Sequence, residues 1–337
     1  MSVGVRERLP ETVAAAAAPL LAVDRLAKHF PIKAGVLQRT VGRLKAVDGV
    51  SFEIARGETF SLVGESGCGK STAGRVIAGL YRPTAGRIVF EGRELDPAAQ
   101  RSKAFRRAVQ MIFQDPFSSL NPRKTVGAIL EAPFEVHGLL SRAERREKVA
   151  ELLVRVSLDP SLRDRYPHEF SGGQRQRIGI ARALALEPKL VVADEPVSAL
   201  DVSIQSQVLN IFEELKAELG LTYLFISHDL AVVKHISDRV AVMYLGRLME
   251  VAGKRSLYAA PHHPYTRALL AAVPRSHPSL PAPERVLLAG EPPSPARPPS
   301  GCVFRTRCPA AMPRCAEAVP ALREVAPAHA VACHLYD

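Results

Sequence analysis

The chain has 337 residues, which is too long for one ordinary compact core and fits a large domain with an extension. Hydrophobic residues make up 47% of it, but only 6% are aromatic and none is tryptophan, which argues against a receptor built on aromatic stacking. The net charge of +11 suits an anionic partner, whether nucleic acid, a phosphate or an anionic membrane surface.

Residues 1–19 are predicted to be a flexible leader on a cytosolic protein. The longest weakly polar run, residues 13–23, has about half the length of a bilayer span and contains Pro19, so it is not a transmembrane helix. Two arginines precede the run, which leaves a secretory signal as the alternative. Thiols stay reduced in the cytosol, and stable disulfides are then not expected.

The first third of the chain predicts mostly strands, with a basic excursion from Pro31 to Arg43 between the first two. The expected elements are strands at residues 21–30, 44–54 and 58–64, a helix at residues 70–80, and a hairpin at residues 87–95 that turns at Glu91 and Gly92.

The middle of the chain predicts a helical insert followed by buried strands. Helices are expected at residues 141–156 and 171–186, since Ser141 and Glu144, like Ser171 and Gln174, have capping-box spacing. Apolar runs typical of parallel strands follow at residues 190–194, 223–227 and 240–246. We therefore expect an α/β core with a mostly parallel sheet and some antiparallel strands. Seven of the twenty residues from 281 to 300 are proline, which favours an extended segment.

The sequence GESGCGKST satisfies the P-loop pattern in the required order of strand, loop and helix. Its glycines allow backbone N–H groups to converge on a polyphosphate, and the helix adds its positive N-terminal end. Lys70 is expected to meet the β- and γ-phosphates, and Ser71 to hold Mg²⁺. The alternative is a glycine-rich turn that matches by chance. The predicted phosphate-binding residues are Gly64, Glu65, Ser66, Gly67, Cys68, Gly69, Lys70, Ser71 and Thr72.

Two adjacent carboxylates end the apolar run LVVADEP, at the edge where open parallel sheets bind ligands. Asp194 would anchor Mg²⁺, while Glu195 would orient and polarise an attacking water. Taken alone, the pair also fits an exposed acidic turn. Cys68 lies in the P-loop near a helix start, where a thiol pKa falls, and we expect a spectator whose alkylation blocks ATP.

The stretch FSGGQRQR places Ser171, Gly172, Gly173 and Gln174 at a helix start, which gives a second anion site. A capped helix with no further role is the alternative. With this motif the chain resembles the ATP-binding cassette (ABC) family, in which two cassettes pair head to tail and the signature of one closes over the ATP of the other. The resemblance implies an ATPase. A free-standing P-loop kinase has no need of the second site.

The resemblance also implies roles for four further residues. Gln114 in MIFQDP resembles the Q-loop glutamine that touches Mg²⁺ or its water, and His228 in FISHD resembles the switch histidine at the γ-phosphate. Asp201 in SALD resembles the D-loop aspartate of the dimer interface, although alone it would be a helix N-cap. Phe30 stands where an aromatic ring stacks on adenine, with a core residue as the equal alternative.

The stretches FQDPFSSLNPRKTVG and HHPYTRALLAAVP look like the ATPase subunits of bacterial oligopeptide and dipeptide importers, more similar to the second of their two ATPases. This implies peptide import, with nickel or glutathione as alternative cargo. The implied partners are a homologous ATPase or a second copy, two permease subunits and a periplasmic binding protein, at the cytoplasmic face of the membrane. No nucleic acid is expected, although cassette ATPases that act on DNA or ribosomes are a further alternative. The groove near Gln114 to Leu130, with Phe113, Phe117 and Leu120, is expected to receive the permease.

Four of the five cysteines lie after residue 300, separated by five, six and seventeen residues. The spacing differs from the common zinc knuckle, and buried unliganded thiols are an alternative. The resemblance implies a 4Fe-4S cluster, with zinc as the runner-up, held by Cys302, Cys308, Cys315 and Cys333. We expect an ATPase domain at residues 20–254, with a helical subdomain at about 115–186, and an extension at residues 255–337.

Overall fold

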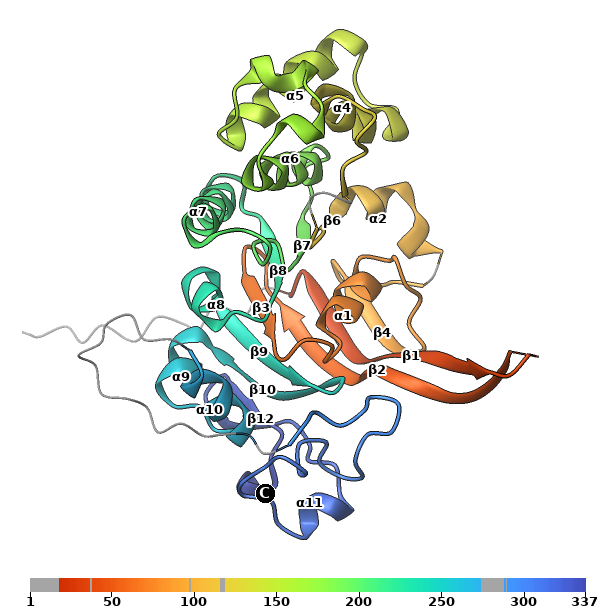
Figure 1. The fold of residues 1–337 in the computed structure, drawn as a ribbon, viewed down its shortest axis with the longest axis vertical. Helices are drawn as coiled ribbons and strands as arrows, with labels where there is room; N and C mark the ends of the chain where they lie inside the picture. Colours follow the sequence, from red (N-terminus) through yellow and green to blue (C-terminus); the bar gives the residue numbers. More distant parts are fainter. Residues whose placement is uncertain (1–17, 37, 97, 116–118, 274–287, 289) are drawn as a thin grey trace, which may run out of the picture.

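The computed structural model describes residues 18–36, 38–96, 98–115, 119–273, 288 and 290–337 (Figure 1). Most of the predicted leader lies outside the described residues, as do Phe117 and part of the proline-rich segment.

The larger sheet has eight strands in the described residues, in the order β11, β12, β10, β9, β3, β8, β7, β6. From β9 to β6 the strands are parallel, and β10, β12 and β11 are antiparallel. The predicted α/β class with a mostly parallel sheet is confirmed. The strands are β3 (Thr59–Val63), β6 (Val109–Ile112), β7 (Leu190–Asp194), β8 (Thr222–Ser227), β9 (Arg239–Tyr244), β10 (Arg247–Gly253), β11 (Arg323–Ala326) and β12 (His329–Val331).

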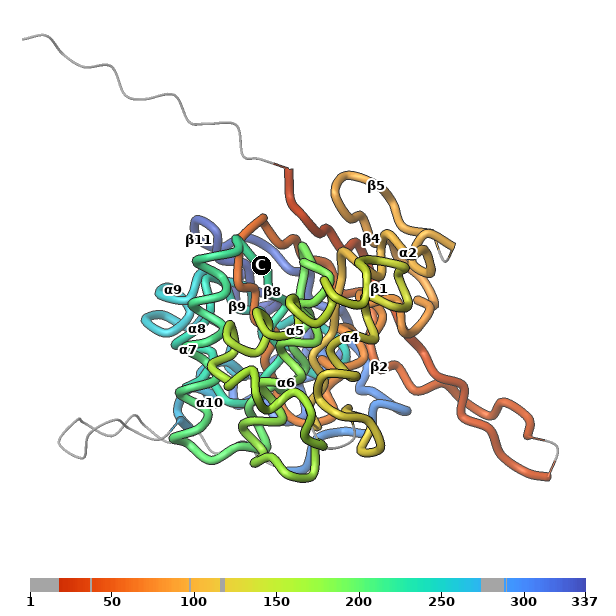
Figure 2. Tube along the Cα trace, turned by 90° about the horizontal axis from the view of Figure 1, so that it is seen from above, coloured from red at the N-terminus to blue at the C-terminus, as the bar shows by residue number. Residues whose placement is uncertain are grey.

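The smaller sheet is antiparallel, in the order β2, β1, β4, β5. It consists of β1 (Leu21–Ala34), β2 (Arg39–Ile54), β4 (Ala85–Phe90) and β5 (Arg93–Glu94). The prediction that an excursion from Pro31 to Arg43 separates the first two strands is wrong, because both strands continue into this stretch and Ala34 pairs with Arg39. The paired ends form an arm that projects from the body (Figures 1 and 2).

The helices cover the larger sheet and form a separate group at one end of the molecule (Figure 1). The α-helices are α1 (Lys70–Ile77), α2 (Lys103–Ala108), α4 (Val126–His137), α5 (Arg142–Arg155), α6 (Gly172–Leu184), α7 (Val202–Leu219), α8 (Leu230–Ile236), α9 (Lys254–Ala259), α10 (Pro264–Ala271) and α11 (Arg314–Glu317). Short 3-10 helices occupy Ala99–Arg101, Pro160–Asp164, Pro167–Glu169 and His334–Tyr336. In the described residues no helix is long and apolar enough to cross a bilayer.

The group at the end contains α4, α5 and α6. Both predicted capping boxes are present, at Ser141 with Glu144 and at Ser171 with Gln174. Helix α4 was not predicted, although Thr125 caps its start, because Pro133 in its interior interrupts the helical pattern.

The C-terminal segment completes the larger sheet rather than forming a lobe of its own. Strand β12 pairs with β10, so β11 and β12 extend the sheet beyond β10. Phe304 and Tyr265 are fully buried and pack on Tyr244 of β9. The segment obtains a hydrophobic core by sharing that of the sheet.

A buried carboxylate ties this segment to β10. Glu250 is fully buried, and its two oxygens accept hydrogen bonds from the backbone N–H groups of His262 at 2.7 Å and His263 at 3.0 Å. His329 Nε2 lies 2.7 Å from the same carboxylate. Three elements distant in sequence therefore meet at one satisfied polar group.

Candidate active site

The P-loop connects β3 to α1 and passes close to the backbone of two other segments, at Met243 and Ala46. A Cβ atom on Gly64 would lie 2.1 Å from the carbonyl oxygen of Met243, and one on Gly69 would lie 1.9 Å from that of Ala46. Both glycines also have positive φ, 150° and 109°. A larger residue fits at neither position, so the glycines fix where the loop backbone runs.

The Lys70 side chain is held by the P-loop itself. Its ammonium group donates to the carbonyl oxygens of Gly64 at 2.7 Å and Glu65 at 2.9 Å, and the residue is 4% exposed. Cys68 is also buried, with its Sγ 3.8 Å from Lys70 Nζ. Burial raises the pKa of the Cys68 thiol more than the lysine lowers it, so the expected fall in that pKa is wrong.

Asp194, the last residue of β7, meets the start of α1. Ser71 Oγ donates to Asp194 Oδ1 at 2.6 Å, and Arg75 Nη2 lies 3.5 Å from Oδ2. Asp194 is fully buried, and this burial raises its pKa against the effect of the two neighbours. Among the described residues, no group donates a hydrogen bond to Oδ2. A hydroxyl beside a carboxylate oxygen with spare accepting capacity is a donor set that Mg²⁺ prefers.

Glu195 turns the chain out of the strand direction. Its φ of 47° is left-handed, which is rare for a residue with a side chain and costs on the order of 1 kcal/mol. Gln114 Nε2 donates to Glu195 Oε2 at 2.8 Å, and His228 Nδ1 lies 3.2 Å from the same oxygen. The structure therefore brings together the three residues predicted to be catalytic.

The predicted signature residues lie at the start of α6, in the helical group. Ser171 Oγ accepts from the Gln174 N–H at 3.3 Å, and Gln174 Oε1 accepts from the Ser171 N–H at 3.0 Å. A Cβ atom on Gly173 would lie 2.3 Å from Ile204 Cγ2, so this glycine allows α6 and α7 to pack closely. Asp201 caps α7 by accepting from the Ile204 N–H at 3.0 Å.

Ser171, Gln174 and Asp201 thus fill the capping roles that were their alternative interpretation. Within the described part of the chain, no hydrogen bond joins Ser171, Gly172, Gly173, Gln174 or Asp201 to the P-loop. One copy of the chain therefore leaves its two predicted anion-binding motifs unconnected.

Phe30 lies within β1 rather than at its end, because the strand continues to Ala34. Its ring meets the Tyr81 ring edge to face at 5.7 Å, and Lys28 Nζ lies 5.0 Å from the ring centroid. The structure places this side chain against Tyr81 and leaves it half-buried.

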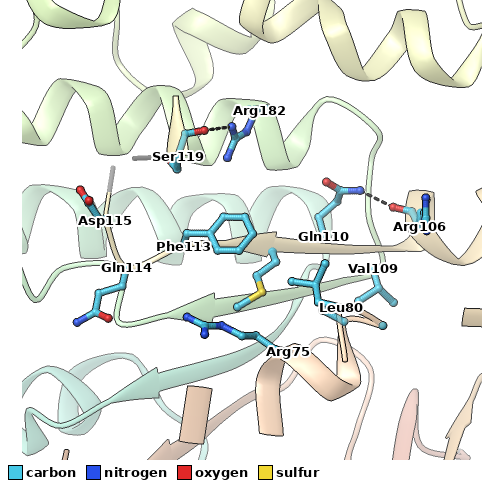
Figure 3. Close-up of a pocket in the computed structure, with 13 residues that line it drawn as sticks. Arg75, Leu80, Arg106, Val109, Gln110, Phe113, Gln114, Asp115, Ser119 and Arg182 are labelled. Carbon is cyan, nitrogen blue, oxygen red and sulfur yellow. Dashed lines mark hydrogen bonds between the residues drawn. The ribbon is translucent and has the colours of Figure 1, made fainter. Parts of the chain in front are cut away.

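A cavity of about 790 Å³ lies beside Gln114, between the cassette body and the helical group (Figure 3). Its lining includes Phe113 and Gln114, with arginines at positions 75, 106 and 182. The expectation that Leu120 contacts a permease here is wrong, because Leu120 is 2% exposed and belongs to the hydrophobic core of the helical group. Phe117 lies outside the described residues.

The four C-terminal cysteines lie near one another. Burial raises the pKa of Cys302 to about 11, and Cys315, Cys333 and Cys308 add to the rise by like-charge repulsion. Backbone N–H groups two residues further on bond to three of the thiols and oppose the rise, at Cys302, Cys308 and Cys333. In the part of the chain that the structure describes, no three His, Cys, Asp or Glu side chains stand in a metal-binding arrangement.

Sequence reasoning missed the contacts of Glu65 with the C-terminal segment. The Glu65 N–H donates to Tyr265 Oη at 3.0 Å, and Arg307 Nη1 donates to both oxygens of its carboxylate at 3.0 Å. Tyr265 and Arg307 are 200 and 242 positions from Glu65 in the chain, so no local sequence pattern could predict these contacts.

Two family models match the sequence. The one described as ABC transporter matches residues 47–198, and the one described as oligopeptide/dipeptide transporter, C-terminal region, matches residues 249–315. The chain is 60% identical over 322 residues to the oligopeptide transport ATP-binding protein AppF of Bacillus subtilis, covering 94% of this chain and 98% of that one. It is 57% identical over 316 residues to a putative peptide import ATP-binding protein of Brucella ovis, with 94% and 97% covered.

Solved cassettes share the fold. A post-hydrolysis dimer of the ATP-binding cassette MJ0796, bound to ADP and phosphate, matches with a TM-score of 0.61 at 29% identity, over 70% of this chain and 99% of that one. The structure of cbiO1 from Clostridium perfringens, described as part of the ABC transporter complex cbiONQ, also gives a TM-score of 0.61 at 29% identity, over 72% of this chain and 91% of that one.

Proposed function

The chain belongs to the ATP-binding subunits of bacterial oligopeptide and dipeptide ABC transporters, and from that premise we propose how its residues power the import of peptides. It is an ATPase, and peptide import is the function that its relatives and its C-terminal family match support. The observation that carries the residue assignment is the convergence of Gln114 and His228 on the Glu195 carboxylate, next to the P-loop.

In this proposal the nine P-loop residues, Gly64 to Thr72, hold the ATP phosphates with their backbone N–H groups. Lys70 exchanges its two carbonyl partners for the β- and γ-phosphates. Ser71, Asp194 and Gln114 hold Mg²⁺, which supplies positive charge against the phosphate oxygens. Asp194 Oδ2 supports this assignment, because within the described residues it faces Arg75 at 3.5 Å but accepts no hydrogen bond.

Glu195 acts as the general base that orients and polarises the attacking water. Gln114 and His228, which lie on two other segments of the chain, both contact its carboxylate and so fix its orientation. His228 also faces the γ-phosphate. These three residues do the chemistry, and Phe30 remains a prediction as the adenine contact.

The second anion site acts on a different molecule. Ser171, Gly172, Gly173 and Gln174 would close over ATP held by a second copy or a homologous ATPase, with Asp201 at the interface. The separation of this motif from its own P-loop supports a paired arrangement. ATP binding then closes the pair and hydrolysis reopens it.

The transport partners are proposed from the family. Two permease subunits would dock at the cavity beside Phe113 and Gln114, a binding protein would deliver the peptide from outside, and the chain would sit at the cytoplasmic face of the membrane without a nucleic-acid partner. The cassette is assigned to residues 20–254, with the helical subdomain at about 115–186, and the extension to residues 255–337.

The cysteines of the extension are proposed to hold a 4Fe-4S cluster, with zinc as the second candidate. The gathering of four thiols and the N–H groups directed at three of the sulfurs are suited to metal-bound thiolates. The side chains do not yet stand in a ligating arrangement, so binding requires them to move together. Anaerobic purification followed by iron and zinc analysis decides among a cluster, zinc and no metal.

The function is tested with vesicles that contain the permease pair and this ATPase with its partner, supplied with binding protein and ATP. Uptake of a labelled dipeptide or oligopeptide is expected, and Lys70→Ala should abolish both ATP binding and uptake. Phe113→Ser should reduce uptake and spare ATP hydrolysis by the isolated subunit. Uptake of nickel or glutathione in place of peptides would reject the proposed cargo.

A further inference from the structure

Within the described residues, the hydrogen bonds between the C-terminal segment and the P-loop all go to Glu65. The backbone N–H of Glu65 donates to Tyr265 Oη at 3.0 Å, from α10. Both of its carboxylate oxygens accept from Arg307 Nη1 at 3.0 Å. A residue in the phosphate-binding loop is thus held through its main chain and its side chain by the extension.

Both partners of Glu65 are rigidly placed. Tyr265 is fully buried, and its ring packs on Tyr244 and Phe304. The Arg307 side chain is 9% exposed, with its guanidinium carbon 6.0 Å from the centroid of the Tyr244 ring. The ion pair therefore differs from an exposed one, whose two side chains must lose their freedom each time it forms.

The contact leads directly to the lysine of the loop. The Glu65 carbonyl accepts from Lys70 Nζ at 2.9 Å, beside the Gly64 carbonyl at 2.7 Å. Moving Glu65 therefore shifts the N–H and the carbonyl that flank the phosphate-binding position. A loop already held in its binding conformation loses less freedom when its ligand arrives, and affinity rises accordingly.

We propose that Arg307 is a positioning residue for ATP binding, which fixes Glu65 and makes the affinity of the P-loop depend on the fold of the cysteine-containing segment. Arg307 directly precedes Cys308, so the residue that holds Glu65 is the sequence neighbour of one of the four cysteines. The inference rests on the proposed assignment of Gly64–Thr72 to ATP.

The test compares nucleotide binding by the full chain and three variants. A non-hydrolysable ATP analogue is titrated by calorimetry, and steady-state hydrolysis gives KM and kcat. Arg307→Ala should weaken binding about tenfold and raise KM similarly, with a much smaller change in kcat. Arg307→Lys should recover part of the affinity, since a lysine keeps the charge but not the planar fork. Arg305→Ala is the matched control, because among the described residues that guanidinium donates hydrogen bonds to Ser300 alone.

A double-mutant cycle separates this contact from general damage to the extension. If Arg307 acts through Glu65, then Arg307→Gln combined with Glu65→Gln should bind no more weakly than the worse single variant. Additive losses, wild-type affinity in Arg307→Ala, or equal losses in Arg305→Ala would each overturn the inference. If Arg307→Ala does not fold, Glu65→Gln alone should show the same loss of affinity.

The Lys70→Ala variant distinguishes failure of this link from failure of the P-loop assignment. If Lys70→Ala binds the analogue as well as the wild type does, the assignment of the loop to ATP is wrong. If Lys70→Ala loses binding while Arg307→Ala keeps it, only the role of Arg307 is wrong.

Discussion

Two buried acidic centres lie on the larger sheet, and they are built in opposite ways. In the middle of β10, the two oxygens of Glu250 accept from two backbone N–H groups and face an imidazole nitrogen. At the end of β7, one oxygen of Asp194 has no hydrogen bond within the described residues, and Glu195 adopts a left-handed backbone. A satisfied carboxylate holds elements together, whereas an under-satisfied or strained one retains capacity for a ligand.

The largest expected effect is on the rate of ATP hydrolysis, at the centre formed by Asp194 and Glu195. Glu195→Gln should lower ATP hydrolysis by at least about 100-fold, because an amide does not take a proton from water. ATP binding and the free energy of unfolding should change little. Phosphate release and analogue binding measure the two quantities. Glu187→Gln is a suitable control, since Glu187 is an exposed glutamate that also has a left-handed backbone. Normal hydrolysis by Glu195→Gln would remove the general-base role.

Removing the carboxylate of Glu250 should lower the stability of the fold. Glu250→Ala leaves three N–H groups buried near β10 without their acceptor, and we expect the free energy of unfolding to fall by about 3 kcal/mol. Denaturant unfolding measures the loss, with the exposed Glu53→Ala as the control. If the two variants are equally stable, the contrast between the centres does not hold.

Replacing Asp194 should raise the stability of the protein and lower its activity. Asp194→Asn keeps the contact with Ser71 but removes a buried charge, so the protein without nucleotide should gain roughly 1 kcal/mol at pH 7 while Mg²⁺-dependent hydrolysis falls. The pKa of Asp194 is raised by burial above its usual 3.8, so the folded state binds the extra proton and wild-type stability falls as the pH rises through that raised pKa.

The gain from Asp194→Asn should therefore be largest at neutral pH and shrink on acidification, as the wild-type carboxyl takes up its proton. Unfolding of both proteins in urea across this range gives the measurement. A gain that grows on acidification would contradict the assigned direction of the pKa.

The smallest effect is expected at Cys68, which lies in the P-loop but packs like a core residue. Its raised pKa and burial should make alkylation at pH 8 slow, and ATP should slow it little further. Mass spectrometry after timed labelling can compare Cys68 with the half-buried Cys308 in metal-free protein. Rapid labelling of Cys68 would contradict this prediction and show that its thiol is reactive.

The sequence was sufficient for features that depend on local pattern. The strand, loop and helix around Lys70 and the two capping boxes follow from short-range spacing, and they occur as predicted. The arm formed by β1 and β2 and the sharing of a core by the C-terminal segment depend on pairing between distant residues, which local pattern does not encode.

Side-chain environments show the same division. The resemblance to a known family pointed to Gln114 and His228, which meet at Glu195. No motif pointed to the left-handed backbone of Glu195 or to the hydrogen bonds of Glu250. The pKa of Cys68 was predicted in the wrong direction, because the helix start was visible in the sequence and the burial was not.

The pairing of β12 with β10 also protects the sheet from unwanted association. Without the C-terminal segment, β10 would be an outer strand with a nearly continuous buried face and unpaired backbone groups, which is a template for aggregation. The segment moves that border to β11, a four-residue strand that begins with the exposed charges of Arg323 and Glu324. Shortening the chain before β12 should therefore cost solubility at high protein concentration, independently of any effect on the nucleotide site.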